Sequence, residues 1–180
     1  MKDIYDSIET RIGEGKDLEL PSGKMEAYQS ELSSMVSDHY ASRNLVSKAF
    51  ISPLSDQFSE SRETFKKISR PFTPDIIVYC KSNYLFLEEG VKGIEAELRL
   101  DEFEKACGYY PKVIVEEKGG LIIVEENGKS IQTVLEVFTD MMKISYLSEQ
   151  FGGPQFMTGE QISFIDKWEV ENYRRSVAKR

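Results

Sequence analysis

Residues 111–154 carry the pattern that most constrains how this chain can fold. Pro111 precedes an apolar run at 113–115, a Gly-Gly pair follows, and a second apolar run occupies 121–124. The segment 131–151 then places apolar side chains on two helical faces and stops at Gly-Gly-Pro. This order predicts a strand, a tight turn, a second strand and a long helix. Because its apolar residues lie on two faces, we expect that helix to be sandwiched between layers.

Apolar runs upstream predict further strands. Residues 75–80 (DIIVYC) are β-branched and apolar on both faces, as in an interior strand. Residues 84–88 (YLFLE) follow after a polar turn, so we expect these two strands to form a hairpin. Residues 44–51 predict a short strand that Pro53 interrupts.

Apolar residues at helical spacing predict four more helices. They lie at 24–37 with Ser22 as the N-cap, at 59–68, at 94–107, and after a capping box at 158–161. In the helix at 94–107 we expect Ile94, Leu98 and Cys107 to face inward and Gly108 to end the helix. The predicted fold class is therefore α/β, with a mixed sheet flanked by helices.

The chain divides into three parts by composition. Residues 1–12 carry isoleucines every four positions and predict a helix without an N-cap, so we expect a remnant helix of a preceding domain. Residues 13–23 are rich in glycine, proline and charge, which predicts a linker. Residues 24–180 are expected to form one α/β domain, since a chain of 180 residues fits a single domain.

Composition excludes several classes of partner. The net charge of -8 repels phosphate backbones, so nucleic acid is not an expected partner. No apolar run approaches the ~20 residues that a membrane helix needs, and the first residues do not form a signal peptide. The two cysteines, Cys80 and Cys107, are expected to be packed thiols of a reduced compartment, which predicts a cytoplasmic protein.

Histidine content argues against a catalytic metal in this chain. A catalytic zinc typically takes three protein ligands, mostly imidazoles, that converge on one point. The sequence contains one histidine, His39, which follows a predicted helix and has no partner at ligand spacing. We expect His39 to be an exposed residue at a helix end. A Ser-His-Asp triad on this residue stays open, although no nucleophile-elbow motif supports it. We assign neither catalytic nor metal-binding residues.

Gly128-Lys129-Ser130 lies between a strand and a helix, where a phosphate loop belongs. A phosphate loop needs a further glycine five residues before Gly128, and Ile123 stands there instead. We therefore interpret the tripeptide as a turn followed by an N-cap, with anion binding at the helix N-terminus left open. The candidate anion-binding residues are Lys118, Gly119, Lys129 and Ser130.

Three acidic pairs occur at the ends of predicted strands, namely 88–89, 116–117 and 125–126. Paired carboxylates can serve acid and base chemistry. Adjacent residues on a strand point to opposite faces, however, so no pair converges by itself. We expect all three pairs to be solvated.

The stretch VIVEEKGGLIIVEENGKSIQTVLEVF resembles a segment of the class II aldolases, the adducin-related sugar-phosphate lyases. In that family a strand leads into Asn-His-Gly-Leu, and an apolar strand, a turn and a long helix follow. Gly120-Leu121 matches Gly-Leu, Lys118 falls where the family has Asn, and Gly119 falls where it has the metal-binding His. RPFTPDIIVYCKSNYLFLEE (70–89) and the tail 148–174 resemble two-domain bacterial members of the family, so the resemblance covers roughly residues 25–174.

The resemblance implies a non-catalytic C-terminal domain of a sugar-phosphate aldolase-like protein, in a degenerate copy of the fold that lacks the metal histidines. Zinc or another divalent metal would belong only to a preceding catalytic aldolase domain, and this chain would hold no cofactor. Packing or oligomerisation would be its role, with that domain and further copies of the chain as partners.

Two alternatives stay open. The first is a lyase in its own right with a non-metal site, built on carboxylates or on a phosphate-binding helix at Ser130. The second is a stand-alone α/β protein that binds a small metabolite or phosphate near Lys118, Gly119 and Lys129.

Overall fold

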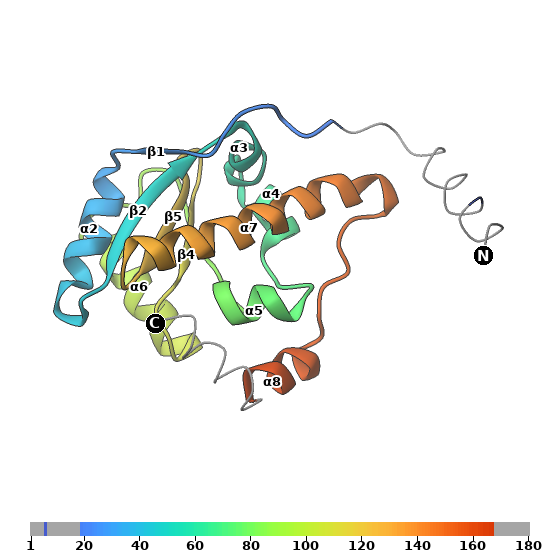
Figure 1. Ribbon diagram of the computed structural model, residues 1–180. Coiled ribbons are helices and arrows are strands. Elements are labelled where there is room, and N and C mark those ends of the chain that lie inside the picture. The colour runs from blue at the N-terminus through green and yellow to red at the C-terminus, as the bar shows by residue number, and fades with distance from the viewer. Residues whose placement is uncertain (1–5, 7–18, 168–180) are drawn as a thin grey trace.

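The computed structural model describes residue 6 and residues 19–167, and it has a five-stranded mixed sheet between two layers of helices (Figure 1). The strand order is β1-β2-β5-β4-β3. Neighbouring strands are antiparallel except for β3 and β4, which are parallel. The predicted class, a mixed sheet flanked by helices, is confirmed. The strands are β1 (Glu26–Tyr28), β2 (Val46–Ile51), β3 (Leu85–Leu87), β4 (Val113–Glu116) and β5 (Gly120–Glu125).

Alternation along the central strand β5 divides the core in two. Leu121 and Ile123 face one cluster of buried side chains, and Ile122 and Val124 face the other. Successive residues of a strand point to opposite faces, so a strand that is apolar throughout must be covered on both. The first face is covered by α3 (Pro53–Ser59), α4 (Arg62–Phe65), α5 (Pro74–Cys80) and α7 (Gly128–Ser148). The second is covered by α2 (Glu31–His39) and α6 (Ile94–Cys107).

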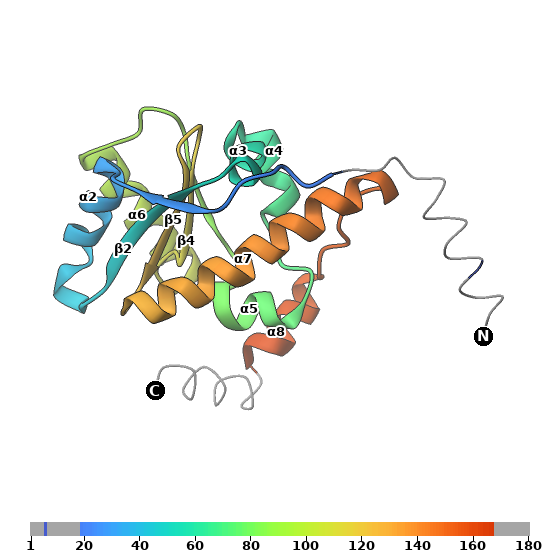
Figure 2. The ribbon, with the colours of Figure 1, turned by 45° about the horizontal axis from the view of Figure 1, so that its top comes forward.

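Helix α7 is the longest element and runs across the first face of the sheet (Figures 1 and 2). It begins three residues earlier than predicted, because Asn127 and not Ser130 is its N-cap: the Asn127 side chain accepts a hydrogen bond from the Ser130 amide at 2.9 Å. The turn η3 (Glu149–Phe151) follows, and Gly152 ends it in the left-handed region at φ 94. The predicted Gly-Gly stop is therefore confirmed.

The predicted strand at 75–80 is wrong, because these residues form α5. Thr73 is the N-cap, Pro74 takes the first helical position and Asp75 lies in the first turn. These three residues favour a helix start more strongly than the β-branched run favours a strand. The hairpin with 84–88 is consequently wrong too, and β3 pairs in parallel with β4 instead.

The predicted helix at 24–37 is wrong in its first part. Residues 26–28 form the edge strand β1, which pairs with β2, and α2 begins only after the N-cap Ser30. The Ser30 side chain accepts the Ser33 amide at 3.1 Å, so Ser22 is not the cap. The strand predicted at 44–51 is confirmed as β2, and Pro53 beyond it starts α3 at the N1 position.

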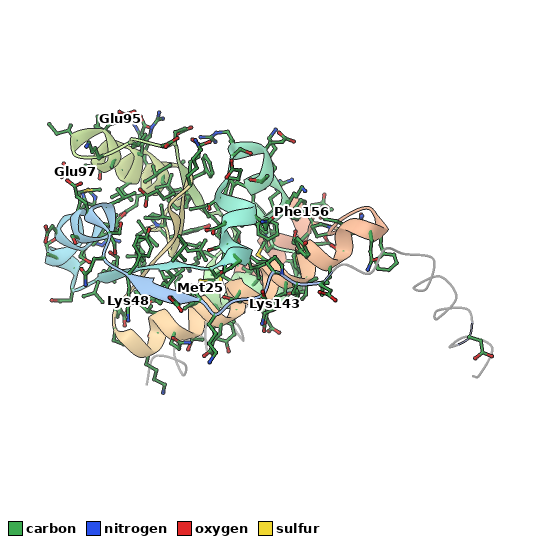
Figure 3. The ribbon with its side chains drawn as sticks, turned by 90° about the horizontal axis from the view of Figure 1, so that it is seen from above. Met25, Lys48, Glu95, Glu97, Lys143 and Phe156 are labelled. Atoms are coloured by element: carbon green, nitrogen blue, oxygen red, sulfur yellow. The ribbon has the colours of Figure 1, made fainter. Side chains whose placement is uncertain are left out.

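Helix α6 has the predicted bounds, and Gly108 ends it at φ 78. Its orientation differs from the prediction, however. Ile94 and Leu98 are 77% and 55% exposed, whereas Ala96 and Leu100 are buried against the sheet. Figure 3 shows Glu95 and Glu97 on the outer side of the same helix.

The remaining elements agree with the sequence patterns. The helix predicted at 59–68 is present as α4 and the turn η2 (Lys66–Ile68), with Phe65 and Ile68 buried. The capping box is formed, since the Thr158 and Gln161 side chains each bond the other's amide, and it starts α8 (Gly159–Lys167). Across the part of the chain that the structure describes, no helix combines the length and apolar character needed to cross a membrane.

Candidate functional site

The four candidate anion-binding residues lie at the two ends of β5 and do not form one site. Lys118 and Gly119 belong to the turn between β4 and β5, which precedes the first residue of β5. Lys129 and Ser130 lie in the first turn of α7, which follows the last residue of β5. A strand of that length separates the two pairs by about 20 Å.

Contacts within the chain hold the β4–β5 turn. Lys118 has φ 58, and its amide donates to the Ser59 carbonyl oxygen at 2.8 Å. Its ammonium group pairs with Glu89 at 2.7 Å, and the Glu117 carboxylate accepts the Glu89 amide at 3.0 Å. The lysine is therefore engaged by a carboxylate of its own chain, which competes with any anion at this end of the sheet.

A side chain at Gly119 would require the Glu116 side chain to move. A Cβ atom placed there would overlap the Glu116 carboxyl group. The Gly119 carbonyl oxygen also accepts a hydrogen bond from the Tyr28 hydroxyl on β1. Burial raises the pKa of Glu116, although the Tyr28 hydrogen bond opposes that rise. The Glu116 side chain therefore occupies the space beside Gly119, the position where the resemblance places a histidine.

The residues at this turn do not fit a metal ion. A hollow of about 430 Å³ adjoins the turn, and its charged lining residues are Glu31, Lys92 and Glu116. The described residues contain no group of three or more histidine, cysteine, aspartate or glutamate side chains that could hold a metal.

His39 lies away from the turn, at the end of α2. Its Nε2 atom is 3.3 Å from Asp101 Oδ1 on α6, and its side chain is 18% exposed. The expectation of an exposed histidine is therefore wrong, because the ring packs edge-on against Tyr40 and lies beside Asp101. A histidine and a carboxylate do meet here, but no described hydroxyl group lies within hydrogen-bond distance of the ring, so the described residues give no triad.

A separate pocket of about 240 Å³ opens at the other end of the sheet, between α5, the start of β4 and the start of α7. We call it the tyrosine pocket. Of the four candidate residues, only Ser130 lines it. Its lining comprises Val78, Tyr79, Lys81, Tyr109, Tyr110, Lys112, Glu125, Ser130, Thr133 and Val134.

A buried ion pair lies in the tyrosine pocket. The Lys112 ammonium contacts the Glu125 carboxylate, and their side chains are only 14% and 4% exposed. The Tyr110 hydroxyl lies 3.4 Å from the same carboxylate, and the Glu126 amide donates to it at 3.3 Å. The expectation that all three acidic pairs are solvated is therefore wrong for Glu125, which ends the fully buried β5.

Tyr109 and Tyr110 of the pocket remain neutral near pH 7. Burial raises the pKa of Tyr110 above its usual range, and the charge on Glu125 adds to that effect. Burial also raises the pKa of Tyr109, whose hydroxyl accepts a hydrogen bond from Asn83 at 2.9 Å. The Lys81 ammonium lies 5.2 Å from the centre of the Tyr109 ring. Neutral phenols can donate hydrogen bonds while their rings supply an apolar surface.

The backbone of Lys81 adopts a conformation that is almost restricted to glycine, with φ 69 and ψ -179. It follows the last residue of α5, and its amide bonds the Ile77 carbonyl at 3.1 Å. Beneath the pocket, Cys80 donates to the Val134 carbonyl at 3.7 Å. Burial raises the pKa of the Cys80 thiol, so it is not a nucleophile near neutral pH.

Sequence reasoning missed most of this pocket. Lys112 precedes β4 and Glu125 ends β5, and only the antiparallel register of the two strands brings them together. The available signal was the Tyr109-Tyr110-Pro111-Lys112 run just before a strand, since adjacent aromatic residues beside a cation favour a binding surface.

Comparison with known proteins supports the fold. No family model matches the sequence, and no curated protein does either. An aldolase II superfamily protein from Pseudomonas syringae has a similar structure, with a TM-score of 0.51 and 11% identity, over 80% of this chain and 58% of that one. YgbL from Escherichia coli, a proposed aldolase/epimerase/decarboxylase, has a TM-score of 0.47 and 14% sequence identity, over 66% of this chain and 56% of that one. The match thus spans less than two thirds of either structure, and the likeness to the Pseudomonas protein confirms a class II aldolase-like fold.

Proposed function

We propose that this chain is a non-catalytic C-terminal domain of a class II aldolase-like protein. Its role is to pack against a catalytic aldolase domain and to form homo-oligomers. The observation that carries the proposal is the turn at Gly119, where the resemblance places a metal ligand and this chain has a glycine packed against Glu116. Metal-dependent cleavage of a sugar phosphate needs a metal that polarises the carbonyl group, and the described residues contain no group of side chains that could hold one.

The exposed face of α6 supports a packing role. Ile94 and Leu98 are one helical turn apart, so they form a continuous apolar strip on the outside of the domain. Exposure of such apolar side chains to water is unfavourable in free energy, and burial against a partner would remove that unfavourable contribution. By helical spacing Glu95 and Glu97 flank this strip, as the charged rim of an interface would, and Figure 3 shows both on the outside of α6.

An activity assay tests the absence of catalysis. The purified chain is supplied with zinc and with a panel of ketose and aldose phosphates, and carbonyl products are measured. The proposal predicts no turnover and less than one equivalent of bound metal after dialysis. Turnover that a chelator stops would indicate that the chain is a metal-dependent aldolase. Turnover that a chelator leaves unchanged would favour the lyase with a non-metal site. Either result overturns the proposal.

The packing role is tested by light scattering after gel filtration. We expect the chain to self-associate and the double variant Ile94→Glu/Leu98→Glu to be monomeric with an unchanged circular dichroism spectrum. The matched control is Ile144→Glu, because Ile144 is 50% exposed on α7, at the opposite face of the sheet. A monomeric wild-type chain, or equal effects of the two variants, would contradict self-association through α6.

A further inference from the structure

We propose that the tyrosine pocket binds a small organic carboxylate that has an apolar or aromatic body. This inference is independent of the proposed non-catalytic role, because the pocket lies at the opposite end of β5 from the turn at Gly119. Its volume of about 240 Å³ lies just below the range for drug-sized ligands, which favours a small molecule.

The walls favour a flat apolar body. Val78 and Tyr79 come from α5, Val134 comes from α7, and Tyr109 closes the pocket from the segment before β4. Figure 2 shows α5 beside α7, and both helices contribute lining residues to the pocket. Aliphatic and aromatic walls with a few polar groups are typical of small-molecule sites, where the walls bind the body and the polar groups orient it.

The charges favour an anionic head group. Two lysines and one glutamate line the pocket, so its lining is positive in a chain whose net charge is -8. The Glu125 carboxylate already accepts hydrogen bonds from the Lys112 ammonium, the Tyr110 hydroxyl and the Glu126 amide. The Lys112 ammonium has three donors, and among the described residues its acceptor is Glu125 alone. Two donors therefore remain for a ligand, and they are oriented by the buried pair.

The start of α7 adds to this preference. Ser130 and Thr133 line the pocket from the first turns of that helix. The N-terminal end of a helix carries a partial positive charge, which favours a carboxylate nearby. Lys81 supplies a second ammonium at the rim, although its own backbone is held in a strained conformation. Two ammonium groups and the N-terminal end of a helix thus lie on the wall of this pocket.

The binding test adds benzoate as the probe to the full chain. Binding is measured by calorimetry and by the NMR chemical-shift changes of the pocket residues. Benzamide is the neutral control of the same shape, and inorganic phosphate is the anion without an apolar body. We expect benzoate to bind and to shift the Val134 and Tyr109 signals. Benzamide is expected to bind at least about tenfold more weakly, since it loses the charge-assisted hydrogen bonds. Absence of benzoate binding, equal binding of benzamide, or tighter binding of phosphate would each overturn the proposal.

Two pairs of variants locate the site. Thr133→Phe fills the pocket and is expected to abolish benzoate binding, whereas Thr139→Phe, at a half-buried position of the same helix outside the pocket, should leave it intact. Lys81→Gly relieves the backbone and removes the ammonium, so we expect an equal or higher Tm and at least about threefold weaker binding. Asn44→Gly is its control, because Asn44 also has positive φ (55) but lies away from the pocket. Full benzoate affinity in Thr133→Phe would contradict this location.

Discussion

The Glu116 side chain occupies the space that a side chain at Gly119 would need. The two residues belong to one hairpin, and the Gly119 amide donates to the Glu116 carbonyl at 2.9 Å. The restriction is steric and not conformational, because Gly119 does not have positive φ. A larger residue at position 119 therefore requires a change in the position of the Glu116 side chain.

Gly119→Ala is expected to destabilise the chain by about 1–3 kcal/mol, because the new methyl group must displace Glu116. The measurement is urea unfolding. Glu116→Ala removes the obstacle, so the double variant should lose less stability than the two single variants added together. Additive losses would show that the two side chains do not compete for the same space.

The charge on Glu116 gives a pH-dependent prediction. Burial raises its pKa in the folded chain above the ordinary value of 4.5, so the folded chain binds a proton more tightly than the unfolded chain does. The resulting stabilisation is complete below the unfolded-state pKa and is lost as pH rises through the folded-state pKa. Glu116→Gln removes this dependence. Relative to wild type it should therefore gain stability between pH 4 and pH 7, and a constant difference across that range would contradict the prediction.

The cap of α7 can be located by substitution. Asn127→Ala should cost about 1 kcal/mol, because the Asn127 side chain accepts the Ser130 amide. Ser130→Ala should change the free energy of unfolding by less than about 0.5 kcal/mol, since Ser130 caps nothing. Thermal unfolding by circular dichroism measures both. A larger loss for Ser130→Ala than for Asn127→Ala would reverse the assignment.

The pair Lys112–Glu125 should respond strongly to single substitutions. Lys112→Met leaves a buried carboxylate without its cation and is expected to cost about 3–5 kcal/mol. The double variant Lys112→Met/Glu125→Met replaces both charges by apolar groups of similar size. It should recover most of that loss, as judged by urea unfolding, whereas a double variant as unstable as the summed singles would show that the two charges are not coupled.

Local patterns predicted the elements whose ends are marked in the sequence. Gly108 ended α6 at the predicted residue, and the Gly-Gly turn placed β4 and β5 correctly. The strand predicted at 75–80 was wrong because the Thr73-Pro74-Asp75 helix start outweighs the strand preference of the β-branched residues that follow it. Such a conflict is decided by capping, because Pro74 and the Thr73 cap fix the backbone at the first turn of the helix.

Long-range packing accounts for the rest. Residues 26–28 form a strand only because β2 offers an edge, which no local pattern shows. The outward position of Ile94 and Leu98 depends on Ala96 being small enough to lie against the sheet. The candidate anion residues were grouped by charge and glycine content, and the length of β5 keeps them apart. The tyrosine pocket depends on the register of β4 and β5, so the patterns of single segments could not predict it.

The hydrogen bond from Tyr28 to the Gly119 carbonyl ties the short strand β1 to the tip of a distant hairpin. β1 has only three residues, and it covers the edge of β2. If this tether were lost, the amide and carbonyl groups of β2 would be open to pairing with another molecule. The phenol at position 28 therefore helps to hold β1 in place along the edge of β2.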